Sequence, residues 1–234
     1  MSGILYLIPT TISQNNPGDT LPANLLQTVE TLDEFITENI KTTRRFLRSI
    51  GFSGDFDQIP YHQLNKHTPE NEIPSFLKGL DENKHIGLFS EAGVPCVADP
   101  GAVVVKIAHQ KGIIVKPLSG PSSIFMALSA SGFNGQNFAF NGYLPIDAKK
   151  RKEKIKQLEN RVYQENQTQI FIEAPYRNNA LLDAFADSCR PETLLCIASG
   201  ITSDTEFIQT KPISHWRKQK PNLHKKNTVF LLYK

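Results

Sequence analysis

Four side chains in the sequence have the chemistry of a general base, because carboxylates and imidazoles are the groups that most often take up a proton in catalysis. They are Glu38, His62, Glu91 and Glu173. Each also has an ordinary structural use. Glu91 falls in a loop whose backbone amides it could hold, and His62, which is expected to lie in a polar loop over 61–72, has no partner visible in the sequence. The sequence offers four alternatives for proton transfer and does not choose among them.

A second group of candidates is cationic, because guanidinium and ammonium groups hold phosphates. Arg44 lies within about one helical turn of two further arginines, and Arg177 follows a strong strand pattern. Lysines concentrate at 149–156 and from Lys211 to Lys234, where six Lys and one Arg occur without an acid in a chain of net charge +3. These clusters could bind a phosphate backbone, or they could be solvated surface that aids solubility. The arginine helix could likewise simply face solvent.

The stretch 90–101 is expected to bring such groups to a ligand. It follows a short apolar run at 86–89, which indicates a buried strand, and precedes a helical pattern over 102–112 that a glycine ends. Asp99 is expected to cap that helix, with Pro100 in the first turn. A long loop at the carboxyl end of a strand is where open α/β sheets bind ligands. The alternative is an ordinary connection with a proline-rich detour.

A second corner is predicted within residues 112–133. An apolar strand over 112–118 is followed by the turn SGPSS and by a helix that Ser122 or Ser123 could cap. Backbone amides at a helix N-terminus also favour carboxylates and other anions. This corner could therefore face a ligand, or its serines could be plain helix caps.

The order of the elements predicts an α/β protein with two domains. Strand and helix patterns alternate in the first half, which indicates a mainly parallel sheet, whereas strand patterns follow one another in the second half, which indicates a mixed sheet. We expect one α/β domain over residues 1–117 and a second over 118–234. A chain of 234 residues is long enough for two cores.

Several classes of protein are disfavoured by what the sequence lacks. Neither G-x-G-x-x-G nor G-x-x-x-x-G-K-[ST] occurs, no apolar run is long enough to span a membrane, and the N-terminus does not read as a signal peptide. The three cysteines form no C-x-x-C pair and suit a reducing compartment, so we expect a cytoplasmic protein. His62 and His67 lack the companions of a metal site, so no metal is expected.

Five stretches carry motifs in a set order. They are YHQLN (61–65), SEAGVPCVADPG (90–101), PLSGPSSIFMALSASG (117–132), FNGYLP (140–145) and EAPYR (173–177). They resemble Y-H-E-H-N, S-D-A-G-T-P-x-x-S-D-P-G, P-L-P-G-P-S-A-x-x-x-A-L-S-A-S-G, F-x-G-F-L-P and E-S-P-H-R. These are motifs of the tetrapyrrole-methylase-like (class III) methyltransferases, and within them of the bacterial small-subunit rRNA ribose 2′-O-methyltransferase branch. The resemblance runs over most of the chain.

The resemblance implies a two-domain class III methyltransferase fold with S-adenosyl-L-methionine in the cleft between the domains, and usually a homodimer. It assigns the cofactor to one loop of the first domain and to two short segments of the second domain, at 122–123 and 199–200. The positions are Ala92, Gly93, Val94, Val97, Ser122, Ser123, Ser199 and Gly200. Glu173 would lie near the methionine end or the substrate. RNA would be the methyl acceptor, with Arg44 and Arg177 as candidates to position its phosphates.

The sequence departs from the family's motifs in three places. The loop at 10–19 has inserted residues and has lost the glycine of P-T-P-I-G-N-L-x-D, 38–41 reads ENIK in place of E-D-T-R, and 198–202 reads ASGIT in place of A-R-E-L-T. In the family the first two loops face the substrate. The acceptor therefore stays open between RNA, a tetrapyrrole or another small molecule. A cofactor-binding module without catalysis is the third alternative.

Overall fold

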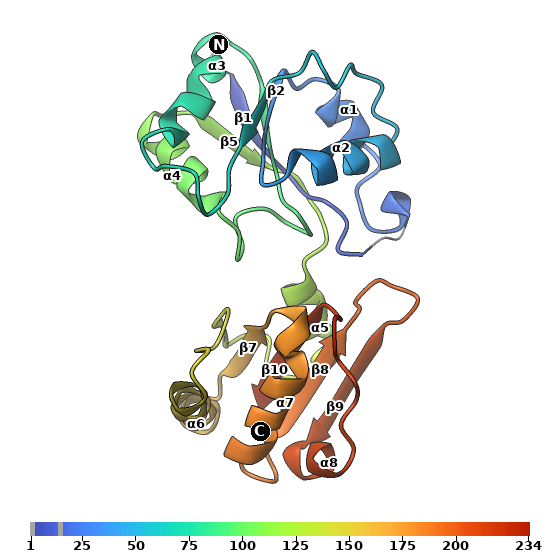
Figure 1. The fold of residues 1–234 in the computed structure, drawn as a ribbon, viewed down its shortest axis with the longest axis vertical. Coiled ribbons are helices and arrows are strands. Elements are labelled where there is room, and N and C mark those ends of the chain that lie inside the picture. Colours follow the sequence, from blue (N-terminus) through green and yellow to red (C-terminus); the bar gives the residue numbers. More distant parts are fainter. Residues whose placement is uncertain (1–2, 14–15) are drawn as a thin grey trace. The chain divides into compact units, whose positions relative to one another are not determined.

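The computed structural model of the protein describes residues 3–13 and 16–234. Part of the altered loop at 10–19 therefore lies outside the described residues, and its effect on the acceptor stays a prediction. Two compact units make up the chain, Met1–Ser122 (unit 1) and Ser123–Lys234 (unit 2) (Figure 1).

Unit 1 is built on a sheet of five parallel strands. In spatial order they are β3 (Tyr61–Gln63), β2 (Glu34–Thr37), β4 (Ile86–Phe89), β1 (Ile4–Ile8) and β5 (Ile114–Pro117). All four residues of the central strand β4 are buried, as expected when helices cover both faces of a parallel sheet. Because the strands are parallel, their carboxyl ends and the loops that follow lie along one edge, which we call the carboxyl edge.

Helices pack on both faces of this sheet (Figure 1). One face is covered by α1 (Leu25–Val29) and α2 (Ile40–Ser49), and the other by η2 (Ile73–Leu77), α3 (Lys78–Asp81) and α4 (Ala102–Gln110), while a short turn, η1 (Pro17–Asp19), precedes α1. The α2 helix starts where Asn39 caps it, with the side-chain oxygen accepting from the backbone N–H of Lys41 and Thr42. That cap places Glu38, the residue before it, at the carboxyl edge.

Two local expectations for unit 1 are wrong. Gly101, and not Asp99, is the residue that precedes α4, and no side chain caps this helix. Asp99 Oδ1 instead accepts from the backbone N–H of Cys96 at 2.9 Å and of Gly101 at 2.6 Å, so the carboxylate folds the loop rather than the helix end. His62 does not lie in a loop but on the short edge strand β3, because three residues there pair in parallel with β2.

Unit 2 contains a mixed sheet of five strands. In spatial order they are β6 (Phe138–Phe140), β7 (Thr168–Ile172), β10 (Thr228–Tyr233), β8 (Leu194–Ser199) and β9 (Phe207–Pro212). The β6–β7 pair is parallel and the other neighbours are antiparallel. The predicted fold class, a mainly parallel sheet followed by a mixed one in an α/β protein, is confirmed.

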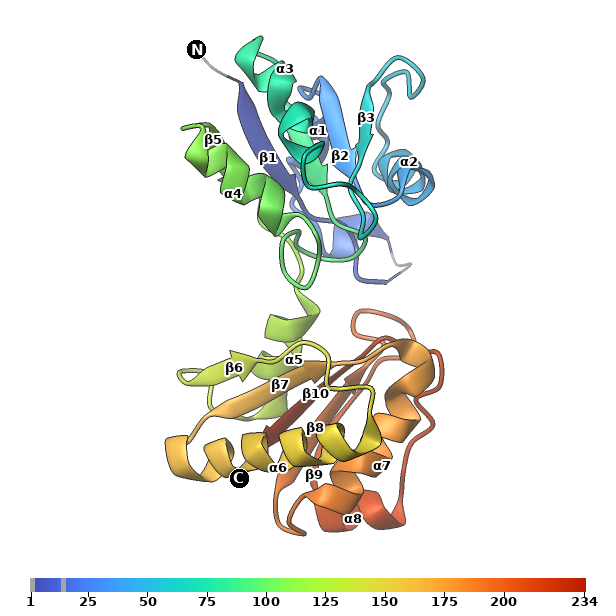
Figure 2. The same ribbon diagram turned by 60° about the vertical axis from the view of Figure 1, so that its left-hand side comes forward.

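The helices of unit 2 enclose its sheet. One face is covered by α6 (Ala148–Glu165), α7 (Asn178–Ser188) and α8 (Ile213–Lys218), the other by α5 (Ser123–Ser131), and the turn η3 (Pro175–Arg177) leads into α7. Figure 2 shows α6 running in front of the strands. Ile155, Leu158 and Val162 lie on one face of α6 at helical spacing and pack into this core, which leaves the opposite face of the helix to solvent.

The two units divide after Ser122, a few residues later than the expected boundary between 117 and 118. The connecting segment stays with unit 1 because Leu118 N donates to the carbonyl of Leu7 at 3.1 Å. Gly120 then lies so close to Pro9 that a Cβ at residue 120 would come within 2.2 Å of the proline ring. The segment after β5 therefore continues along the carboxyl edge of the unit 1 sheet.

Candidate functional site

The loop of residues 90–101 is fastened to the carboxyl edge of unit 1 at Gly93. The Gly93 carbonyl accepts from the backbone N–H of Thr10 at 2.9 Å and from the hydroxyl of Ser90. The two hydroxyls of Thr10 and Ser90 lie 3.2 Å apart and are buried. Because these residues follow the neighbouring strands β1 and β4, one glycine ties two strand ends to the loop.

Gly93 also brings the second predicted corner to the loop. Its φ is +74°, and a Cβ at this position would lie 2.9 Å from the carbonyl oxygen of Pro121 and 3.6 Å from Ile12 Cγ1. Only glycine takes this conformation without strain and leaves room for the proline carbonyl. The 90–101 loop and the segment that ends at Ser122 therefore meet within unit 1.

The backbone of the loop is strained beyond Gly93. Cys96 (φ 69°) and Ala98 (φ 59°) take left-handed conformations that cost side-chain-bearing residues on the order of 1 kcal/mol each. The two hydrogen bonds to Asp99 hold them there. Burial raises the pKa of the Cys96 thiol to about 12, so this sulfur stays protonated and is a poor nucleophile. Strain of this kind concentrates at binding sites.

The side chains predicted to touch the cofactor have different exposures. Ala92 and Val97 are exposed, the latter by 45%, whereas Val94 and Ser122 are half-buried. The loop thus presents small apolar groups and its own backbone at the carboxyl edge. Such a lining suits the uncharged parts of a nucleoside ligand. Cofactor contact by these residues stays a prediction.

Two of the predicted bases, Glu38 and Glu91, lie at the carboxyl edge near Asp99. Burial, and then repulsion from Glu91 and Asp99, raises the pKa of Glu38. Glu91 Oε1 accepts from the hydroxyl of Thr42 at 2.6 Å. Burial also raises the pKa of Asp99, although its two backbone hydrogen bonds oppose the shift. Glu38 therefore holds its proton to higher pH than an ordinary glutamate does, as a proton acceptor working near neutrality needs.

His62 lies elsewhere in unit 1. Its Nε2 is 2.8 Å from Glu34 Oε2, and its ring stacks on Phe76. Lys84 Nζ lies 3.3 Å from the other oxygen of Glu34. Glu34 opens β2, so this group is near the amino ends of the strands, at the edge opposite the 90–101 loop. The structure therefore gives His62 a structural partner, Glu34.

Arg44, predicted to position substrate phosphates, also has internal partners. It donates to the carbonyl of Phe56 at 2.8 Å and pairs with Asp57 at 3.1 Å. Its guanidinium lies 5.0 Å from the centre of the Tyr61 ring. These contacts fasten α2 to the segment before β3, and any role of Arg44 with substrate stays a prediction.

In unit 2 the predicted catalytic Glu173 and the predicted substrate residue Arg177 bind each other. Glu173 Oε1 accepts from Nη2 of Arg177 at 2.6 Å, from its Nε at 3.1 Å and from the backbone N–H of Ala174 at 2.7 Å. The glutamate side chain is almost fully buried, and Tyr176 beside it is 67% exposed. Glu173 therefore holds the turn after β7, and its Oε1 is already engaged by Arg177 and Ala174.

The other predicted cofactor residues of unit 2 contribute in different ways. Ser123 begins α5 and is half-buried. The buried hydroxyl of Ser199 accepts from the hydroxyl of Thr228 at 3.0 Å, so it is already used internally. Gly200, with φ +61°, starts a tight turn in which its carbonyl accepts from Ser203. At 199–200 the turn backbone is therefore the part available to a ligand, and its role stays a prediction.

Three residues that organise these edges were not singled out from the sequence. Thr10 and Ser90 hold Gly93 through hydrogen bonds. Their position just after two strand patterns is the sequence feature that could have identified them. Asn178 directly follows EAPYR and is fully buried. Its amide nitrogen donates to Lys226 O at 2.6 Å and reaches Thr228 Oγ1 at 3.3 Å, whereas its Oδ1 has no partner among the described residues.

Two negative findings apply to residues 3–13 and 16–234. No group of three or more His, Cys, Asp or Glu side chains is arranged to hold a metal ion. No helix in this part of the chain has the length and apolar character needed to cross a bilayer.

Curated relatives match nearly the whole chain. "Ribosomal RNA small subunit methyltransferase I" of Vibrio cholerae is 30% identical over 233 residues, which cover 98% of this chain and 77% of the relative. The protein of the same name from Bacillus subtilis is 34% identical over 185 residues, or 79% of this chain and 59% of the relative. No protein-family model matches the chain.

Solved structures share the fold. A cobalamin biosynthetic enzyme, cobalt precorrin-4 methyltransferase, superposes with a TM-score of 0.64 and 14% identity, covering 98% of this chain and 94% of the other. At this identity the likeness shows the fold alone, and that fold is the one expected from the sequence motifs. With the curated relatives, it leads to one conclusion: the chain is a methyltransferase and belongs to the class III family of ribosomal RNA small subunit methyltransferase I.

Proposed function

We propose that this enzyme transfers a methyl group from S-adenosyl-L-methionine to a ribose 2′-hydroxyl of small-subunit ribosomal RNA. The observation that carries the proposal is the construction around Gly93. There a strained loop is hydrogen-bonded to two strand ends and packs closely against Pro121 at the carboxyl edge of a parallel sheet. The relatives, which are named as ribosomal RNA small subunit methyltransferases, support RNA as the acceptor class, and the ribose 2′ position rests on the resemblance of the motifs.

The residues present fit the proposed donor. Methyl transfer from a sulfonium is an in-line displacement, so alignment of donor and acceptor supplies much of the rate. Main-chain groups on a rigid loop serve that purpose, and the missing Cβ of Gly93 leaves the close approach that such a loop needs. Within unit 1 the donor would be held by Ala92, Gly93, Val94, Val97 and Ser122, and within unit 2 by Ser123, Ser199 and Gly200. When bound, the donor supplies an electrophilic methyl group.

Glu38 is the proposed general base. The Glu38 carboxylate would take the proton of the ribose hydroxyl as that oxygen displaces the donor's sulfur, which would leave as a thioether, from the methyl carbon. The alternatives are occupied: His62 by Glu34, Glu173 by Arg177 and Glu91 by Thr42. The carboxylate of Glu38 makes no hydrogen bond or ion pair within the described part of the chain, so it is available to a hydroxyl.

The relatives also bear on the choice between acceptors. A tetrapyrrole acceptor draws only on the shared fold, whereas the sequence relatives over nearly the full chain are named for ribosomal RNA. A module without catalysis is disfavoured by the free carboxylate of Glu38 beside the loop. Homodimer formation and a cytoplasmic location remain parts of the proposal that rest on the resemblance. Light scattering of the purified protein tests the first, because a monomer would exclude it.

The experiment uses small ribosomal subunits from a strain that lacks this enzyme. Incubation with purified protein and radiolabelled S-adenosyl-L-methionine should label the RNA. Alkaline hydrolysis should then stop at one ribose, because a 2′-O-methyl group removes the attacking hydroxyl. Label on a base, or an unchanged modification map, would overturn the proposed acceptor.

A further inference from the structure

The first half of α6 carries a dense positive charge. Five lysines and one arginine accompany a single acid, Glu153, over residues 149–156. The cations are Lys149, Lys150, Arg151, Lys152, Lys154 and Lys156. Lys149, Lys150, Lys152 and Lys156 are exposed, because Ile155 and the apolar positions that follow it anchor the opposite face of the helix in the core.

These lysines are not used to hold the fold. Within the described residues no ammonium group of the five forms a hydrogen bond or an ion pair, and Glu153 makes none either. The second basic stretch differs. Arg217 donates to the carbonyls of Ala186 and Cys189, and Lys220 pairs with Asp183. Part of the positive charge near the C-terminus therefore has a structural purpose that the charge on α6 lacks.

The charge on α6 also opposes helix stability. Lys149, Lys150 and Arg151 stand in the first turn, where the helix dipole favours anions, and this turn contains no acid. Lys152 and Lys156 are like charges four residues apart on one face. An anionic partner would explain why this helix carries positive charges that oppose its stability in both ways. Several lysines spaced along a helix suit a run of phosphates better than one small anion.

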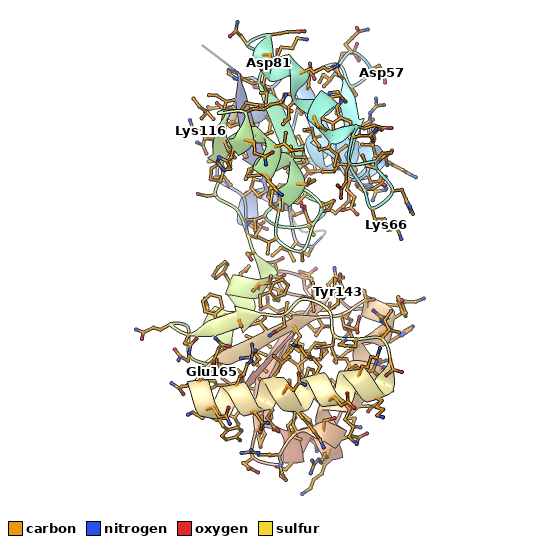
Figure 3. The ribbon with its side chains drawn as sticks, turned by 90° about the vertical axis from the view of Figure 1, so that its left-hand side faces the viewer. Asp57, Lys66, Asp81, Lys116, Tyr143 and Glu165 are labelled. Carbon is orange, nitrogen blue, oxygen red and sulfur yellow. The ribbon has the colours of Figure 1, made fainter. Side chains whose placement is uncertain are left out.

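An exposed aromatic side chain lies on the loop that leads into α6. The loop between β6 and α6 is held by a bond from Ile172 N to the Gly142 carbonyl at 3.1 Å and by Arg151, which donates to the Ile146 carbonyl at 3.0 Å. Tyr143 nevertheless stays 58% exposed, and Figure 3 labels it on this loop. An exposed aromatic ring on a loop that leads into a basic helix is a combination that suits single-stranded nucleic acid, through base stacking and phosphate contacts.

We infer that Tyr143 and the exposed lysines of α6 form a docking surface for a single-stranded segment of RNA. The inference rests on the proposed function and deepens it, because it names the part of unit 2 that holds the substrate. Tyr176, exposed after the parallel neighbour β7, lies at the same strand ends and extends the surface. The basic stretch near the C-terminus is not part of it.

Two variants of equal charge change test the surface. One changes Lys149, Lys150, Lys152 and Lys156 to Gln, and the control changes Lys211, Lys218, Lys225 and Lys226 to Gln. All eight lysines are exposed, so both variants should fold, which circular dichroism checks. Binding is measured by fluorescence anisotropy with a labelled single-stranded RNA and with its duplex, over a series of salt concentrations.

The α6 variant should lose at least about tenfold in affinity for the single strand, and its salt slope should fall by about 3, since each single-strand phosphate contact contributes about 0.7. The control should stay within about threefold of the wild type. Tyr143→Ala should lose about five- to a hundredfold at unchanged salt slope. Equal losses in both lysine variants, an unchanged α6 variant, or a preference for duplex would each overturn the surface.

Two further measurements distinguish a failure of this inference from a failure of the proposed function. Calorimetry should show wild-type affinity for S-adenosyl-L-methionine in the α6 variant. Methylation of small subunits by that variant should be slower at low subunit concentration. Normal methylation at every concentration would reject the surface and leave the proposed function standing. Intact RNA binding by a wild-type protein that methylates no subunit would reject the proposed function and leave the surface standing.

Discussion

Glu38 is the residue on which the proposed proton transfer depends. Its pKa is raised because the carboxylate is partly buried and because Glu91 and Asp99 repel its charge. A carboxylate with a raised pKa is a stronger base than an ordinary glutamate. The same environment that prepares it for catalysis makes its charge unfavourable for folding.

Glu38→Gln should lower the rate of methyl transfer about a hundredfold or more, since a positioned general base contributes at least that much. Affinity for S-adenosyl-L-methionine should not change. Single-turnover kinetics on small subunits give the rate, and calorimetry gives the affinity. Glu91→Gln is the comparison variant and should lower the rate much less, because Thr42 already donates to Glu91 and losing its charge only weakens the repulsion that raises the pKa of Glu38. Wild-type turnover in Glu38→Gln would exclude this residue as the base.

The same variant should change how stability depends on pH. A raised pKa means that the folded protein binds this proton more tightly than the unfolded chain does. The resulting stabilisation is complete below the unfolded-state pKa and is lost as the pH rises through the folded value. Glu38→Gln should therefore gain in melting temperature relative to the wild type between pH 4 and pH 7. A difference that stays constant over a calorimetric pH series would contradict the raised pKa.

At the scale of elements, the 90–101 loop is held by hydrogen bonds among its own groups. The periodicity of the apolar residues was enough to predict the strand before it and the helix after it. Periodicity could not predict the hydrogen-bond partners of Asp99. An aspartate before a helix is usually a cap, but here the left-handed turn at Cys96 and Ala98 brings two backbone amides to its carboxylate. His62 was read as a loop residue because three residues give too short a pattern to identify an edge strand.

Two substitutions of Asp99 distinguish the hydrogen-bonding role of this carboxylate from the role of its charge. Asp99→Ala removes both amide bonds and should lower the free energy of unfolding by about 1–3 kcal/mol. Asp99→Asn keeps an acceptor oxygen and should be at least as stable as the wild type at pH 7, because burial disfavours the charge. Urea unfolding followed by circular dichroism measures both. Equal destabilisation by Ala and Asn would show that the charge, and not the acceptor, holds the loop.

At the scale of the whole molecule, two units with separate sheets and cores share the predicted site residues. The motifs predicted the fold class and the family, both of which are confirmed, because glycines and prolines at turns leave a strong sequence signal. They did not predict which of the candidate general bases already have a hydrogen-bond partner. That property depends on partners distant in the sequence, such as Glu34 for His62. The division of roles among the acids therefore comes from the structure.

The central claim is that the loop fastened at Gly93 holds the methyl donor. Calorimetry with S-adenosyl-L-methionine tests it on the wild type, on Gly93→Ala and on Gly112→Ala. Both glycines have positive φ, but a Cβ meets the Pro121 carbonyl only at residue 93 and open space at residue 112. The account predicts binding by the wild type and by Gly112→Ala, and at least about tenfold weaker binding by Gly93→Ala, since 1.4 kcal/mol of strain already gives that factor. Wild-type affinity in Gly93→Ala, or no binding by the wild type at millimolar ligand, would contradict it.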